Sequence, residues 1–167
     1  MRLICASVGL GWVGFTGPLD AKAILEPRAL PALVVPDIEG EAHLHRQSVQ
    51  LRQQLARGGR YRLVDSARVR KLIERNMPRQ ESLHDCNSCI VQIGRQLGAN
   101  QLLVTWVQRA DGQPSSVHYE LYDVIAGRVH RSAAIALASD DDLAWSRVIA
   151  QIALELQRSS AVPRMSE

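Results

Sequence analysis

The spacing of hydrophobic positions along the chain changes from helical to strand-like near residue 100. Before that point, a short apolar run at 32–35 predicts a buried strand, and the segment 61–64 predicts a second short strand. The segments that follow these runs carry apolar residues at helical spacing and predict three helices. Their marker residues are Leu44, Leu51 and Leu55 in the first helix, Val69, Leu72 and Ile73 in the second, and Ile90, Ile93 and Leu97 in the third.

After residue 100, apolar and polar residues alternate over three successive segments and predict three adjacent antiparallel strands. The apolar members are Leu102, Val104 and Trp106, then Val117, Tyr119 and Leu121, then Val129, Ala133, Ile135 and Leu137. Asp111-Gly112 and Ala126-Gly127 supply turn residues between the segments. A last helix follows, with an apolar stripe of Trp145, Val148, Ile149, Ile152 and Leu156.

Polar residues and glycines at the ends of these segments agree with the predicted helix boundaries. Asp65 or Ser66 is suited to cap the second helix by accepting a backbone N–H hydrogen bond. Gly98 fits the left-handed position that follows a helix. The acidic run 140–142 suits the first turn of the last helix, where the helix dipole favours negative charge.

The resulting order is strand, helix, strand, two helices, three strands and one helix. A helix with a single apolar stripe must cover another layer, and here that layer is the sheet. We therefore expect an α/β fold of the α+β sandwich type, in which a mixed sheet of about five strands packs against helices.

The N-terminal 23 residues have the features of a bacterial export signal. Arg2 precedes an apolar run without charge at 3–15, and Ala21-Lys22-Ala23 offers small residues at the positions that a signal peptidase reads. We expect cleavage after Ala23, which predicts a periplasmic or secreted protein without a transmembrane span. The alternative is a retained N-terminal anchor. The remaining divisions are a tether at 24–31, one domain at 32–158 and a flexible tail at 159–167.

The charge balance is too mild to demand a nucleic-acid partner. The whole chain has 20 Lys and Arg against 17 Asp and Glu, and the loss of Arg2, Lys22 and Asp20 with the signal leaves 18 against 16. Few aromatic residues interleave the basic ones, so base stacking is not expected. We expect no nucleic-acid partner and no small-molecule ligand.

Cys86 and Cys89 form the sharpest chemical motif, a single Cys-x-x-Cys pair. In an oxidising compartment the pair favours a structural disulfide, and metal binding and redox exchange remain alternatives. His84 would be the third ligand of a metal site. A closed zinc site needs four ligands, however, so we expect no metal and interpret His84 as a surface histidine.

A strongly basic stretch extends over residues 46–79, where ten Lys and Arg stand against Asp65 and Glu74 only. Such a surface attracts an acidic partner protein or an anionic polymer, although a solvated helix surface has the same pattern. We expect Arg68, Arg70 and Arg75 to contact a partner. The chain lacks a Gly-x-Ser-x-Gly elbow, a phosphate-binding glycine loop and a His-Glu-x-x-His helix, so we expect no enzymatic activity and no cofactor.

Several local motifs resemble a family of uncharacterised secreted bacterial proteins. They are Tyr61-Arg62-Leu63-Val64-Asp65, Cys86-Asn87-Ser88-Cys89, Leu97-Gly98-Ala99-Asn100, and Tyr122-Asp123-Val124 with Gly127-Arg128-Val129. The order of elements also resembles the N-terminal domain of TolB and envelope assembly proteins of the CsgG and LpoB type. The resemblance implies a non-enzymatic domain of the cell envelope and supplies no catalytic residues.

Two functional hypotheses follow. The first is an exported, non-enzymatic protein-interaction or assembly module that binds another envelope protein through a sheet edge or through the basic helical surface. The second is a periplasmic protein that uses Cys86 and Cys89 for thiol redox exchange or metal binding.

Overall fold

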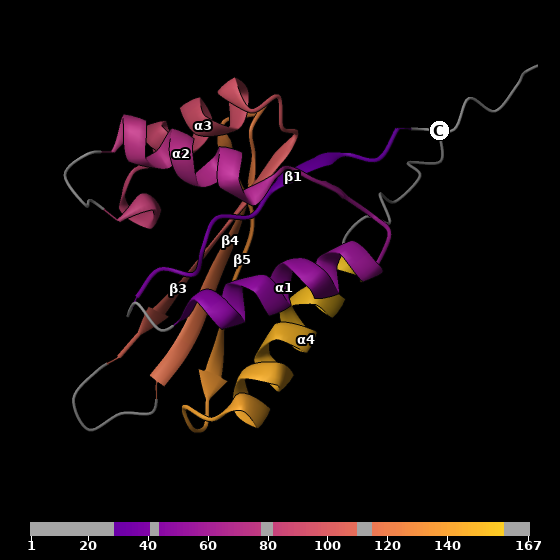
Figure 1. Cartoon of the computed structure of the whole chain (residues 1–167), viewed down its shortest axis with the longest axis vertical. Helices are drawn as coiled ribbons and strands as arrows, with labels where there is room; N and C mark the ends of the chain where they lie inside the picture. The colour runs from indigo at the N-terminus through magenta and orange to yellow at the C-terminus, as the bar shows by residue number, and fades with distance from the viewer. Residues whose placement is uncertain (1–28, 41–43, 78–81, 110–114, 159–167) are drawn as a thin grey trace, which may run out of the picture.

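A five-stranded sheet separates two layers of helices (Figure 1). The computed structural model describes residues 29–40, 44–77, 82–109 and 115–158. The strands are β1 (Ala32–Val34), β2 (Arg62–Leu63), β3 (Gln101–Gln108), β4 (Ser115–Asp123) and β5 (Arg128–Leu137). The helices are α1 (His45–Arg57), α2 (Ser66–Asn76), α3 (Asn87–Gln96) and α4 (Asp142–Arg158), and a short 3-10 helix, η2 (Leu83–Asp85), precedes α3.

The strands lie in the order β2-β1-β3-β4-β5. β1 is parallel to both β2 and β3, whereas β3, β4 and β5 are antiparallel neighbours. The predicted fold class, the mixed five-stranded sheet and the predicted order of elements are therefore confirmed. The 3-10 helix η2 is the one addition to that order among the described residues.

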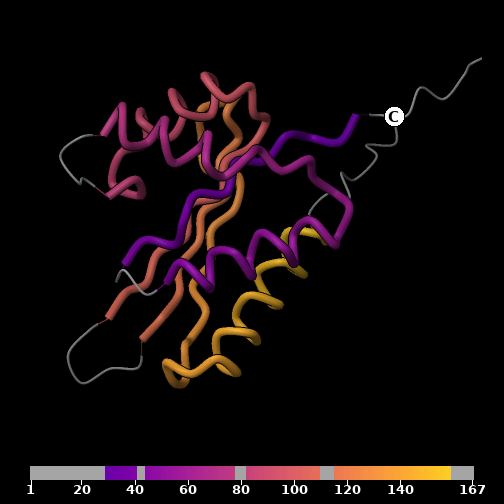
Figure 2. Tube along the Cα trace, viewed as in Figure 1, coloured from indigo at the N-terminus to yellow at the C-terminus, as the bar shows by residue number. Residues whose placement is uncertain are grey.

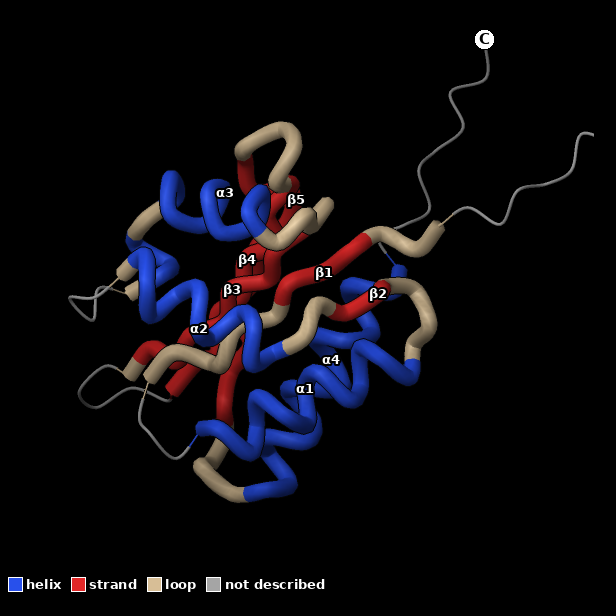
Figure 3. The backbone as a smooth tube through the Cα atoms, turned by 45° about the horizontal axis from the view of Figure 1, so that its top comes forward, coloured by secondary structure: helices blue, strands red, loops and turns tan. Residues whose placement is uncertain are grey.

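The connections of the parallel strands place helices on opposite faces of the sheet. The chain moves outward from β1 to β2 through α1, and then returns across β1 to β3 through α2 and α3 (Figure 2). Parallel crossovers are almost always right-handed, so a reversal of direction puts the second set of helices on the other face. α1 and α4 accordingly cover one face, and α2 and α3 cover the other (Figure 3).

Each face of the sheet carries its own apolar core. Adjacent residues of β1 point to opposite faces, so Leu33 joins the core under α1 and α4 while Val34 joins the core under α2 and α3. The predicted stripe of α4 is wholly buried in the first core. These burials explain why β1, only three residues long, is apolar at every position.

The predicted helix ends are also confirmed. The carboxylate of Asp65 accepts the N–H of Arg68 at the start of α2. The carboxylate of Asp141 accepts the N–H groups of Leu143 and Ala144 at the start of α4. Gly98 follows α3 with φ of 64°, a left-handed conformation that side chains disfavour.

One predicted inward-facing residue of β5 points the other way. Val129 is 39% exposed, whereas Ile135 and Leu137 of the same strand are buried under α4. A register shift at Leu121/Tyr122 of β4 places Val129 opposite Tyr122. Because the shift interrupts the two-residue alternation, the prediction that Val129 continues the pattern is wrong.

The predicted signal peptide 1–23, the first part of the tether, the turn at Asp111-Gly112 and the tail 159–167 lie outside the described residues. Residues 29–31 of the tether are exposed. None of the helices in the described ranges combines the length and apolar character that a membrane span requires.

Candidate functional site

A pocket of about 160 Å³ lies at the carboxyl ends of β1 and β2. The segments after these two adjacent parallel strands diverge to opposite faces of the sheet, and this divergence opens a crevice where α/β proteins commonly bind partners or ligands. The floor of the pocket is apolar and its rim is charged. Floor residues are Val35, Val69, Ile73 and Leu83, and rim residues are Asp37, Arg52, Arg70 and Glu74.

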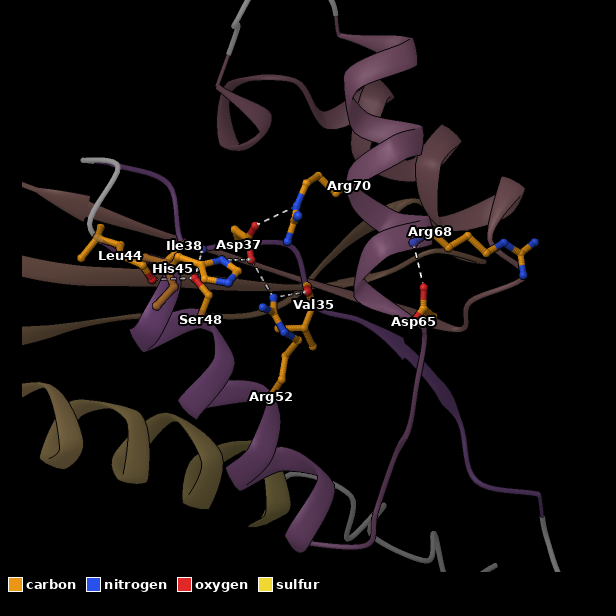
Figure 4. Close-up of polar contacts among 10 residues, drawn as sticks. All are labelled: Val35, Asp37, Ile38, Leu44, His45, Ser48, Arg52, Asp65, Arg68 and Arg70. Atoms are coloured by element: carbon orange, nitrogen blue, oxygen red, sulfur yellow. Dashed lines mark hydrogen bonds and ion pairs between the residues drawn. The ribbon is translucent and has the colours of Figure 1, made fainter.

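Asp37 is the centre of the charged rim (Figure 4). Arg52 Nη1 lies 2.9 Å from Asp37 Oδ1, Arg70 Nε lies 3.5 Å from Oδ2, and His45 Nδ1 lies 4.0 Å from Oδ1. Arg52 also donates to the carbonyl of Val35 at 3.3 Å. Three basic side chains from α1 and α2 therefore converge on one carboxylate beside the pocket.

The two arginines of this rim have different roles. The Arg52 side chain is only 13% exposed and binds both the backbone and the carboxylate of the loop after β1, so it holds that loop in place. The Arg70 side chain is 50% exposed, and an ion pair so open to water contributes little to stability. Arg70 can therefore exchange Asp37 for another anion at small cost.

Buried hydrogen bonds fix the loop on which Asp37 lies. The N–H of Ile38 donates to Ser48 Oγ at 2.8 Å, and that hydroxyl donates to the carbonyl of Leu44 at 2.9 Å (Figure 4). Ser48 is fully buried. The loop and the first turn of α1 thus form one unit, and the pocket rim is preorganised.

The structure does not bring Arg68, Arg70 and Arg75 together as one contact surface. Arg68 and Arg75 are seven residues apart and share one side of α2, whereas Arg70 lies about 200° around the helix from Arg68. In Figure 4, Arg68 and Arg70 extend from α2 in different directions, and only Arg70 reaches the pocket. The expected contact of Arg68, Arg70 and Arg75 with a partner stays a prediction, and of the three only Arg70 lines the pocket.

Acidic side chains from outside residues 46–79 offset part of the positive charge of the basic stretch. Asp37, outside the stretch, pairs with Arg52 and Arg70, and Asp142 of α4 lies 3.0 Å from Arg46. Exposed basic side chains nevertheless remain numerous on α1, β2 and α2. They are Arg46, Arg57, Arg62, Arg68, Arg70, Lys71 and Arg75.

Cys86 and Cys89 lie at the start of α3, as predicted. Their sulfur atoms are 1.99 Å apart, at disulfide distance, and their Cα atoms are 5.2 Å apart. Cys86 occupies the N-cap position, where its Sγ accepts the N–H of Cys89 at 3.3 Å. A structural role for this pair in the mature protein stays a prediction.

His84 is not a surface histidine, and that interpretation was wrong. Its side chain is 24% exposed, Nδ1 contacts Glu39 Oε2, and the ring stacks on Trp106 with 4.6 Å between centroids. Trp106 stacks in turn on His118 at 5.2 Å. Glu39 also accepts the N–H of Leu83, so it anchors η2 as well as the histidine ring.

No cluster of three or more potential metal ligands occurs within the described part of the chain. The Glu39–His84–Trp106–His118 assembly was not predicted from the sequence. The contact between Trp106 and His118 had a signal in the sequence, because the two residues lie on strands that were predicted to be adjacent. They are direct cross-strand neighbours in the structure.

Two buried tyrosines act as hydrogen-bond donors between layers. Burial raises the pKa of Tyr119 and of Tyr122, and bonds to Glu155 and Glu120 respectively raise the pKa values further. The bond from Tyr119 also lowers the pKa of Glu155. Both hydroxyls therefore stay protonated, and Tyr119 links β4 to α4.

Comparison with known proteins adds a family and a fold. A family model described as "Protein of unknown function (DUF2380)" matches residues 25–155. No curated protein matches the sequence.

Among solved structures, the C-terminal domain of LpoB from Salmonella enterica has a TM-score of 0.51 and 20% identity, over 68% of this chain and 87% of that domain. TolB from Acinetobacter baumannii has a TM-score of 0.51 and 14% identity, over 78% of this chain and 28% of TolB. At these identities the likeness shows a shared fold. The resemblance to TolB and LpoB is thus confirmed for the fold, and the resemblance to CsgG stays a prediction.

Proposed function

The chain belongs to the family of the model that matches residues 25–155, which is named DUF3280, and we propose that it is a non-enzymatic interaction module of the bacterial cell envelope. It acts after export to the periplasm, and it binds an acidic segment of another envelope protein at the pocket between α1 and α2. The predicted signal peptide and the fold shared with the LpoB C-terminal domain support the proposed compartment.

One observation carries this proposal, namely an exposed arginine beside a small apolar pocket. The pocket, at about 160 Å³, is smaller than the roughly 300–1,000 Å³ of typical small-molecule sites. It is suited to one apolar side chain of a partner. Arg70 on its rim is suited to a neighbouring carboxylate, and the exposed basic residues of α1 and α2 attract an acidic segment from a distance.

Charge reversal at Arg70 is expected to weaken partner binding about tenfold or more. The change removes the bidentate donor at the rim and sets a carboxylate against the acidic segment, and tenfold corresponds to about 1.4 kcal/mol. The measurement is the Kd between the purified chain and its partner, once cross-linking in the native envelope has identified that partner.

Arg68→Glu is the matched control for Arg70→Glu. It alters the net charge by the same amount on the same helix, but on the side of α2 that faces away from the pocket. Its effect is expected to be smaller and to vanish at high salt, because only the long-range field changes. Equal weakening by both variants would contradict docking at the pocket.

A second candidate function is thiol–disulfide exchange at Cys86 and Cys89. The observation in its favour is the N-cap position of Cys86, where the N–H of Cys89 would stabilise a thiolate after reduction. For an interaction module we expect no free thiol in the natively purified protein and a disulfide that resists dithiothreitol. Alkylation followed by intact-mass analysis measures both, and a readily reduced pair or stoichiometric bound metal would favour the second function.

A further inference from the structure

The two edges of the sheet are protected very unequally. At one edge, β2 has only two residues, and short edge strands offer little to a foreign strand. At the other edge, β5 has ten residues and pairs with β4 alone among the described strands. β5 contains neither proline nor lysine, the residues that commonly block such edges. The register shift interrupts β5 at His130, and beyond it residues 131–137 present a regular row of backbone groups for pairing.

The two ends of this edge carry charges of opposite sign. Arg128, His130 and Arg131 lie at the beginning of β5, residues 132–137 are uncharged, and Asp140, Asp141 and Asp142 follow the end of the strand. Arg128 and His130 are exposed, and the Asp142 side chain is 67% exposed in its surface pair with Arg46. One end of the edge is thus basic and the other is acidic.

We propose that β5 pairs with β5 of a second copy of this chain, antiparallel and around a two-fold axis. In an antiparallel pair the basic end of each strand lies beside the acidic end of the other, so the complementary contact occurs twice. A parallel pair would set like charges together. With Ala134 on the axis, Ser132 of one copy lies opposite Ala136 of the other, and the basic beginning of each strand lies toward the acidic end of its partner.

The side chains in the middle of the edge leave room for a second strand. Ser132, Ala134 and Ala136 are small and exposed, and they point away from the face that α4 covers, because Ile135 and Leu137 between them are buried on that face. Pairing therefore extends the sheet without moving a helix. The pocket beside Arg70 lies at β1 and β2, on the other side of the sheet order, so a dimer would present two free pockets and bind a repeated partner with avidity.

The first test is the mass of the protein purified from its expressing host, measured by sedimentation over about 1–100 µM. We expect a concentration-dependent dimer that weakens in high salt. Ala134→Lys should raise the dimer Kd at least tenfold, because two cations then meet at the axis. Ala150→Lys, at an exposed position of α4, is the control and should leave the Kd unchanged. A protein that stays monomeric over the whole range overturns the proposal.

The second test fixes the register. Ala134→Cys places its thiol opposite itself across the axis and should form an intermolecular disulfide in non-reducing gels. Ala136→Cys alone should not, whereas a mixture of Ser132→Cys and Ala136→Cys should. A dimer that none of these pairs cross-links uses another surface and overturns the proposal. Arg70→Glu should leave dimerisation unchanged, so the failure of partner binding and the failure of dimerisation remain distinguishable.

Discussion

Replacement of Trp145 by alanine is expected to lower the free energy of unfolding by about 3–5 kcal/mol. The indole is 1% exposed within the core between α4 and the sheet, and its Nε1 donates to Asp140 Oδ1 at 2.8 Å. The substitution leaves a large cavity and removes one of the hydrogen bonds that tie the helix to the residues before it. Urea unfolding of the purified protein measures the loss.

Two variants separate the sources of this loss. Trp145→Phe keeps a ring in the core but removes the N–H donor, so it should cost clearly less than alanine. Leu143→Ala lies two residues earlier, at a side chain that is 61% exposed, and should change stability by less than about 0.5 kcal/mol. A loss below about 1 kcal/mol for Trp145→Ala would contradict the described packing of α4.

Gly94→Ala is expected to destabilise the protein by about 1–3 kcal/mol, although alanine is the better helix former. Gly94 is buried in α3, and a Cβ atom built on it would lie 2.5 Å from Val124 Cγ2 and 2.9 Å from Cγ1. Val124 is 1% exposed and β-branched, so it has little freedom to move. The close approach of α3 to the end of β4 therefore requires glycine.

Val124→Ala supplies the control for this prediction. It removes both methyl groups that the new Cβ would meet, so Gly94→Ala should cost much less in the Val124→Ala background than in the wild type. A double-mutant cycle from urea unfolding gives the coupling between the two positions. Strictly additive effects would mean that the two side chains do not compete for the same space.

Periodicity predicted the helices and strands well because their marker residues repeat within single elements. Leu51 and Leu55 are one helical turn apart, and Val117, Tyr119 and Leu121 lie on one face of one strand. Such signals need no knowledge of distant residues. The alternation failed at Val129, because His130 is an extra residue in β5 at the register shift and reverses the face that the residues before it take.

The rim of the candidate site was not predictable from local sequence. Asp37 pairs with Arg52 and Arg70, which lie on two different helices, and Glu39 holds His84 across 45 positions of sequence. Only the topology of the sheet brings these segments together. The sequence does predict that Arg68 and Arg70 extend from opposite sides of their helix, because successive residues of an α-helix are rotated by about 100°.

Site-specific cross-linking in living cells tests the proposed docking at the pocket most directly. A photo-reactive amino acid replaces Glu74, an exposed residue of the pocket rim, and Ala150 of α4 serves as the control position. After irradiation, position 74 should yield an adduct with one defined envelope protein, on a chain that has lost residues 1–23, and Arg70→Glu should abolish it. An uncleaved chain in the cytosol, or the same adducts from positions 74 and 150, would contradict a pocket that binds an envelope partner.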